Sequence, residues 1–114
     1  MHREIIIFKE YFNEFYLEQS QKVRDKIDYV LILITTIKNI PQQYFKHIEG
    51  TEGLYEIRVQ QGNNIFRIFC CFDEGNVIVL FNGFIKKTQK TPKNEIELAE
   101  RLKEEYFELK KSNK

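Results

Sequence analysis

The strongest constraint on the fold is a run of three strand-like segments separated by two turn dipeptides. The segments cover residues 54–60, 64–72 and 76–84, and they are rich in β-branched and aromatic residues. Between them lie Gly62-Asn63 and Glu74-Gly75, both of which are typical of tight β-hairpins. This pattern predicts a three-stranded antiparallel meander.

The register of this meander follows if each turn contains two residues. Gln61 then pairs with Asn64, and Asp73 pairs with Asn76, and the alternation of side chains assigns every residue to one face. One face is almost purely apolar and is expected to receive the helices. The residues expected to be buried there are Tyr55, Ile57, Val59, Phe66, Ile68, Val79 and Phe81.

The opposite face carries two arginines directly across from one another. The same register places Arg58 against Arg67, with Asn82 beside them and Phe84 in the next row. Like charges that face each other on a sheet are destabilising, so this arrangement favours an anionic ligand. Two guanidinium groups near an aromatic ring suit a phosphate and a stacked base.

Two alternatives to this interpretation stay open. The arginines fit equally well as exposed strand residues paired with Glu56 and Asp73. A three-residue first loop would also move Arg67 out of line with Arg58. His47 is a secondary candidate for acid or base chemistry, although a lone histidine before a strand is more often a surface or capping residue.

The net charge is only +1, but the charges are segregated along the chain. Residues 86–93 contain Lys86, Lys87, Lys90 and Lys93 and no acid, whereas residues 94–108 contain six glutamates. A nucleic-acid partner selects a local basic surface rather than a basic total. The charge distribution is therefore compatible with RNA, although such a lysine run is also common on solvated surfaces.

Helical patterns flank the meander on both sides. Residues 4–9 form a short strand, and residues 10–37 have helical spacing divided by Ser20 as an N-cap, which predicts a helical hairpin ended by Pro41. The last helix is expected to begin with Thr91 as N-cap and Pro92 at its first position. Its apolar stripe comprises Ile96, Ala99, Leu102, Tyr106 and Leu109.

These elements predict one α+β domain over residues 1–114, with residues 110–114 as a frayed tail. The longest apolar run, 77–81, is far below the ~20 residues of a membrane helix, and the chain starts without a signal peptide. We therefore expect a cytoplasmic protein with no membrane partner.

Neighbouring Cys70 and Cys71 are expected on opposite faces of a buried strand. Neither a metal nor another cofactor is expected, because no ligand spacing is present.

Three strings in this chain resemble the RelE/ParE superfamily of toxins. They are GLYEIRV at residues 53–59, FRIF at 66–69 and GFIKKTQKTP at 83–92, in the order and spacing of a HigB-like branch that is often described as phage-derived. The resemblance covers essentially the whole chain. It implies helices packed on a curved antiparallel sheet, a helix-turn-helix antitoxin partner of the HigA type, and cleavage of messenger RNA on the ribosome.

The resemblance also implies which residues act. The two strand arginines of the family fall on Arg58 and Arg67, and its basic motif falls on Lys86 and Lys87, followed by Thr88, Gln89 and Lys90. The branch often has a histidine where this chain has Asn82, so no acid or base role is expected at that position. The tyrosine that some RelE-type enzymes use near their C-terminus is not transferred to Tyr106, which lies on an apolar stripe.

The expected function is metal-independent cleavage of messenger RNA by an endoribonuclease. Arg58 and Arg67 are expected to stabilise the phosphoryl charge, and Lys86 or Lys87 is expected to act as base or proton donor. RNA contacts are assigned to Asn82, Phe84, Lys90, Lys93 and His47. Two alternatives stay open: a ParE-like inhibitor of DNA gyrase, and a non-catalytic or degenerate toxin that only binds its antitoxin.

Overall fold

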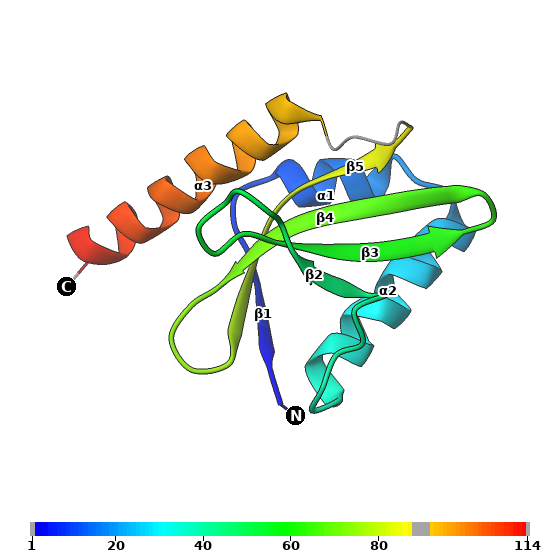
Figure 1. Cartoon of the computed structure of the whole chain (residues 1–114), viewed down its shortest axis with the longest axis horizontal. Helices are drawn as coiled ribbons and strands as arrows, with labels where there is room; N and C mark the ends of the chain where they lie inside the picture. Colours follow the sequence, from blue (N-terminus) through cyan, green and yellow to red (C-terminus); the bar gives the residue numbers. More distant parts are fainter. Residues whose placement is uncertain (1, 88–91, 114) are drawn as a thin grey trace.

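The computed structural model describes residues 2–87 and 92–113. The order of helices and strands confirms the α+β class (Figure 1). The elements are β1 (Glu4–Ile7), α1 (Tyr11–Leu17), α2 (Gln21–Thr36), β2 (Phe45–His47), β3 (Tyr55–Gln61), β4 (Asn64–Phe72), β5 (Val77–Lys86) and α3 (Lys93–Ser112).

The helical hairpin near the N-terminus forms where it was predicted. Ser20 is the N-cap of α2, and its hydroxyl accepts a hydrogen bond of 3.3 Å from the Val23 N–H, which satisfies one of the free donors of the first turn. Helix α2 ends at Thr36, before the predicted boundary at Pro41. Its buried stripe packs against one face of the sheet and comprises Val23, Ile27, Val30 and Ile34.

The five strands form one sheet in the order β1-β5-β4-β3-β2. Strands β3, β4 and β5 are the predicted antiparallel meander, and β1 joins its edge parallel to β5, so the complete sheet is mixed. At the other edge, β2 pairs antiparallel with β3 (Figure 1). Strand β2 was not predicted, because a strand of three residues is too short to show an alternating pattern.

The first hairpin has the predicted register. Gln61 pairs with Asn64, and Arg58 pairs with Arg67. Gly62 has a φ of +62°, which a glycine adopts without strain, and it occupies the first central position as in a type II′ turn. The local turn chemistry therefore sets the position of the two arginines.

The second hairpin has a different register from the predicted one. Its loop contains residues 73–76. Phe72 pairs with Ile78, whereas the predicted register pairs it with Val77. A β-bulge then adds one residue to β5 between the Ile68–Gly83 and Cys70–Leu80 pairs. The predicted pairing of Arg67 with Asn82 is therefore wrong, and Arg67 lies across from Phe84.

The loop has a physical reason for its length. The carboxylate of Asp73 accepts hydrogen bonds from the Tyr106 hydroxyl at 2.6 Å and from the Lys110 ammonium at 2.8 and 2.9 Å. Burial opposes its ionisation, but the hydrogen bonds from Lys110, Tyr106 and the Glu74 N–H outweigh burial and lower the pKa of Asp73. A two-residue turn would require Asp73 to pair with Asn76 instead.

The new register creates two cores instead of one. Val79 and Phe81 are fully buried as expected, but they pack under α3 and not under α1 and α2. The buried Cys70 and Cys71 belong to different cores, which confirms that they point to opposite faces. Helix α3 therefore covers part of the face that was expected to be open.

Helix α3 differs from its prediction at both ends. Thr91, the expected N-cap, lies outside the described residues, and the helix begins at Lys93 directly after Pro92. Ala99 and Leu102 are buried, whereas Leu109 is 51% exposed and leaves the predicted stripe. The helix continues to Ser112, so residues 110–112 are helical rather than frayed.

No helix in the described part of the chain is both long and apolar enough to cross a membrane.

Candidate functional site

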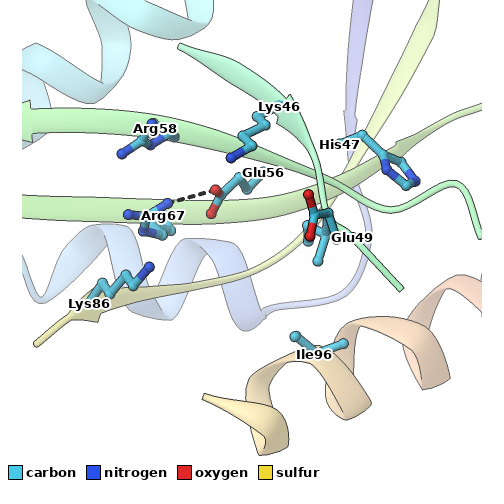
Figure 2. A pocket seen from close by; sticks show the side chains of 9 residues that line it. Lys46, His47, Glu49, Glu56, Arg58, Arg67, Lys86 and Ile96 are labelled. Atoms are coloured by element: carbon cyan, nitrogen blue, oxygen red, sulfur yellow. Dashed lines mark hydrogen bonds and ion pairs between the residues drawn. The ribbon is translucent and has the colours of Figure 1, made fainter. Parts of the chain in front are cut away.

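A polar pocket of about 290 Å³ lies on the side of the sheet that faces α3. Its walls come from strands β2 to β5, from the segment after β2 and from the first turns of α3 (Figure 2). The residues that line it are Lys46, His47, Ile48, Glu49, Glu56, Arg58, Arg67, Lys86 and Ile96.

Four basic side chains from four adjacent strands meet in this pocket. They are Lys46 on β2, Arg58 on β3, Arg67 on β4 and Lys86 on β5. The register places them on one face, because Lys46 pairs with Glu56, two residues before Arg58, and Arg58 pairs with Arg67. The pocket is therefore a concentrated cationic site, although the whole chain has a net charge of only +1.

A buried ion pair lies within this cationic site. Arg67 is 4% exposed and Glu56 is 8% exposed, and Nη1 of Arg67 donates to Oε1 of Glu56 at 2.6 Å (Figure 2). The alternative of exposed arginines paired with acids is correct in that Glu56 pairs with an arginine, but Arg67 is buried rather than exposed. It is wrong for Asp73, which binds Lys110 and Tyr106.

Several polar atoms of the pocket are buried without a hydrogen-bond partner among the described residues. They are Nε of Arg58, Nε of Arg67 and Oε2 of Glu56. An unsatisfied buried polar group destabilises a protein by about 1–3 kcal/mol, so native structures leave few of them. The two free guanidinium N–H groups are suited to bind the oxygens of an anionic ligand.

The environment of Lys86 makes its ammonium group easier to deprotonate. Burial lowers its pKa, the charge of Arg67 lowers it further, and Glu56 partly opposes this effect. Arg58 and Lys46 act in the same direction as Arg67. A lysine of this kind is a better proton donor than an isolated surface lysine.

His47 lies at the rim of the same pocket. Its side chain is exposed, and its Nε2 donates to the Thr51 carbonyl oxygen at 3.1 Å, because a carbonyl can only accept. The imidazole ring also packs with its edge against Tyr55. His47 pairs with Tyr55 and its ring packs on that residue, so its side chain leaves β2 on the face opposite Lys46, and its role as a secondary candidate stays a prediction.

Asn82 and Phe84 do not line the arginine pocket. Asn82 is 3% exposed, and its side-chain amide donates to the carbonyl and carboxylate oxygens of Glu95 at 3.1 and 3.0 Å. It thus fastens β5 to the first turn of α3. Phe84 lies across from Arg67 but is 9% exposed and packs its edge against Phe69, so little of its ring is free for stacking.

The remaining predicted residues lie outside this pocket. Lys87 is exposed and lines a second pocket between α1, β5 and α3. Lys93 is exposed at the start of α3. Lys90 lies outside the described residues.

Sequence reasoning missed Lys46 and Glu49 and assigned no active role to Glu56. Lys46 enters the site because β2 pairs with β3, and the three residues of β2 carry too weak a signal to predict that pairing. The signal for Glu56 was present, since alternation on one strand places it on the same face as Arg58.

Comparisons with known proteins agree with the fold and assign a family. Residues 14–104 match the model of the family described as "Phage derived protein Gp49-like (DUF891)". A chain in the crystal structure of the archaeal RelE-RelB complex from Pyrococcus horikoshii OT3 is similar, with a TM-score of 0.51 and 14% sequence identity. The similarity covers 73% of this chain and 93% of that chain. No curated protein matches the sequence.

The family match and the shared fold confirm the resemblance to the RelE/ParE superfamily, while the HigB-like branch within it stays a prediction. The family model covers most of the chain, from α1 into α3. This chain therefore belongs to the family of phage-derived Gp49-like proteins and has the fold of RelE-type toxins.

Proposed function

We propose that this protein is the toxin of a type II toxin–antitoxin pair and that it cleaves messenger RNA. The observation that carries the proposal is the meeting of Lys46, Arg58, Arg67 and Lys86 in one pocket. Membership of the Gp49-like family and the RelE-type fold support a toxin of the toxin–antitoxin type.

The shape and charge of the pocket favour a phosphodiester. A guanidinium group presents planar N–H donors that match two phosphate oxygens, and here two such groups lie on neighbouring strands. The free Nε atoms of Arg58 and Arg67 add donors on the same side of the sheet. RNA supplies the phosphate together with an adjacent hydroxyl that can attack it.

The proposed reaction uses the 2′-hydroxyl group of the RNA as the nucleophile. Its oxygen bonds to the adjacent phosphorus, the bond from phosphorus to the 5′-oxygen breaks, and the products are a 2′,3′-cyclic phosphate and a free 5′-hydroxyl. Arg58 and Arg67 stabilise the negative charge that develops on the phosphoryl oxygens, and loss of one such donor lowers the rate by roughly 10² to 10³. Lys86 donates a proton to the leaving 5′-oxygen.

We propose that an antitoxin controls this site. A structurally similar chain was solved in a RelE-RelB complex, which supports an antitoxin partner for this chain. The resemblance to the HigB-like branch implies that this partner is a helix-turn-helix antitoxin of the HigA type. An acidic or amphipathic segment of that partner covers the cationic pocket or blocks access to the ribosome. If the purified pair cut ribosome-bound message as fast as the toxin alone, this model of control would be wrong.

Primer extension on messenger RNA tests the proposed cleavage. The wild-type protein is incubated with naked message in the presence of EDTA and with ribosome-bound message in a buffer that keeps the ribosomes intact, and the new 5′ ends are mapped. We expect cuts that end in a 5′-hydroxyl group, and we expect Arg58→Ala to lose them. Lys22→Ala is the matched control, because it removes an exposed positive charge on α2 away from the pocket.

The same preparations separate the alternative functions. Inhibition of gyrase supercoiling with intact RNA would support the ParE-like alternative instead. Antitoxin binding without either activity would show a protein that serves only as a binding partner.

A further inference from the structure

Glu56 places a buried carboxylate inside the cationic pocket, and the proposed reaction assigns it no role so far. Its backbone lies on β3, opposite Lys46 on one side and Phe69 on the other, and its side chain shares a face with Arg58 and Arg67. Figure 2 shows the carboxylate directed toward Arg67 among the basic side chains. We propose that Glu56 is the general base that accepts the proton of the attacking 2′-hydroxyl, an inference that rests on the proposed RNA cleavage.

The two oxygens of this carboxylate have different environments. Oε1 accepts the 2.6 Å hydrogen bond from Arg67, whereas Oε2 is buried without a partner among the described residues. The first contact fixes the orientation of the group, and the second oxygen keeps its capacity to accept a hydrogen bond. An oriented acceptor beside a phosphate site is the geometry that general-base catalysis requires.

The charge of Glu56 is unfavourable for RNA binding alone. A carboxylate in a phosphate site repels the phosphate, and its Coulomb effect is strong in a partly buried pocket. A glutamine would hold Arg67 with its amide oxygen and would lack this repulsion. A glutamine cannot accept a proton under these conditions, so the carboxylate is favoured by a reaction that needs a base.

The position of Glu56 relative to Lys86 fits an in-line displacement. Glu56 is on β3 and Lys86 is on β5, and Arg67 on β4 lies between them on the same face. The attacking and leaving oxygens of a phosphoryl transfer lie on opposite sides of the phosphorus. A phosphate held by Arg67 therefore has a base on one side and a proton donor on the other.

The protons balance over the step. Oε2 of Glu56 takes the proton of the 2′-hydroxyl as that oxygen bonds to phosphorus, and the Lys86 ammonium gives a proton to the 5′-oxygen as its bond to phosphorus breaks. The enzyme is left with a neutral Glu56 and a neutral Lys86. Exchange with solvent restores both groups, and no oxidation or reduction occurs.

The test separates RNA binding from cleavage. Binding is measured by fluorescence anisotropy on an RNA whose cleavage site carries a 2′-deoxy sugar, and cleavage is measured under single-turnover conditions on the matching all-ribose RNA, with ribosomes where the wild type needs them. Glu56→Gln is expected to bind the deoxy RNA as tightly as the wild type or more tightly, and to cleave roughly 10² to 10⁴ times more slowly.

A modified substrate distinguishes the base from the acid. When sulfur replaces the 5′-bridging oxygen, the leaving group needs no proton, so Lys86→Ala is expected to regain activity and Glu56→Gln is not. Glu56→Asp keeps a carboxylate on a shorter side chain, so it is expected to cleave faster than Glu56→Gln, and it reports on the base even if Glu56→Gln does not fold. Rescue of Glu56→Gln by the sulfur substrate would overturn the assignment.

The outcomes separate this inference from the function on which it rests. Wild-type cleavage with an equal rate in folded Glu56→Gln would refute the role of Glu56 alone and would leave it as a residue that positions Arg67. No cleavage by the wild type would refute the proposed function, and the role of Glu56 with it.

Discussion

Replacing Arg67 with alanine tests how the buried ion pair contributes to stability. Glu56 is 8% exposed in the wild type, and the substitution removes the guanidinium that lies 2.6 Å from its carboxylate. Removal of one partner from a buried pair destabilises a protein by about 3–5 kcal/mol. We expect a value near 3 kcal/mol, because the pocket opens to water and Lys46 and Arg58 remain nearby.

An opposing effect acts on the same substitution. Arg67 faces Arg58 across the sheet, and relief of this like-charge contact is stabilising, but cross-strand pairs contribute only about 0.2–1 kcal/mol. The loss of the pair with Glu56 therefore dominates. At about 4 °C for each kcal/mol in a domain of this size, the melting temperature is expected to fall by roughly 12 °C.

Urea denaturation followed by circular dichroism measures this effect. Arg58→Ala is the matched control, because Arg58 is half-buried and has no ion pair among the described residues, and we expect its stability to stay within about 1 kcal/mol of the wild type. Combining Arg67→Ala with Glu56→Gln should recover much of the loss, and the coupling follows from the double-mutant cycle. Equal stability of Arg67→Ala and Arg58→Ala would refute the reasoning.

Three further predictions concern stability outside the pocket. Gly83→Ala should destabilise the fold by about 1–3 kcal/mol in thermal unfolding, because its new methyl group would lie 2.5–2.8 Å from the Phe15 ring; an unchanged melting temperature would be inconsistent with this packing. Burial and the hydrogen bond with Asp73 raise the pKa of Tyr106 from 10.0 to about 12, so the stability that this tyrosine contributes is complete below pH 10 and is lost as the pH rises toward 12. Tyr106→Phe should therefore lose less stability at alkaline pH than the wild type. Identical curves of unfolding free energy against pH for the two proteins would contradict the assignment. Ser20→Ala should lower the free energy of unfolding by about 1 kcal/mol in urea, whereas no change would show that the cap is not formed in solution.

The part of the fold that could be predicted is the part that local chemistry determines. The first hairpin depends on a glycine in the turn and on alternation in two strands, and both are visible in residues 55–72. The pairing of Arg58 with Arg67 follows from this turn alone. The N-cap at Ser20 is local in the same sense.

The second hairpin was not predictable because distant residues decide it. The carboxylate of Asp73 binds Tyr106 and Lys110, which are 33 and 37 residues away in the sequence. The dipeptide Glu74-Gly75 suits a tight turn, yet the contacts with α3 favour a longer loop. The sequence of residues 73–76 alone does not indicate that the longer loop is favoured.

The candidate site shows the same division. Arg58 and Arg67 were identified from alternation, and the resemblance selected the same residues. Lys46 depends on the pairing of a three-residue strand at the sheet edge, and the burial of Glu56 depends on how strands and helices pack around it. These are properties of the assembled sheet.

The bulge in β5 connects the register of the sheet with the composition of the site. Before the bulge, Val79 lies across from Cys71 on the α3 face, and after it Phe84 lies across from Arg67 on that same face. Without the extra residue, the pairing of Cys71 with Val79 would continue to place Gly83 opposite Arg67, and Lys86 would point toward the other core.

The extra residue therefore lets one strand bury apolar side chains under α3 and still direct Lys86 into the cationic pocket. Asn82, within the bulge, binds Glu95 in the first turn of α3, so the start of that helix is tied to the irregularity that orients Lys86. Asn82 thus contributes to the site through the backbone it holds rather than through contact with a ligand. A residue that looks like part of a binding surface in the sequence is, in the folded protein, a structural support for a lysine four positions further along the strand.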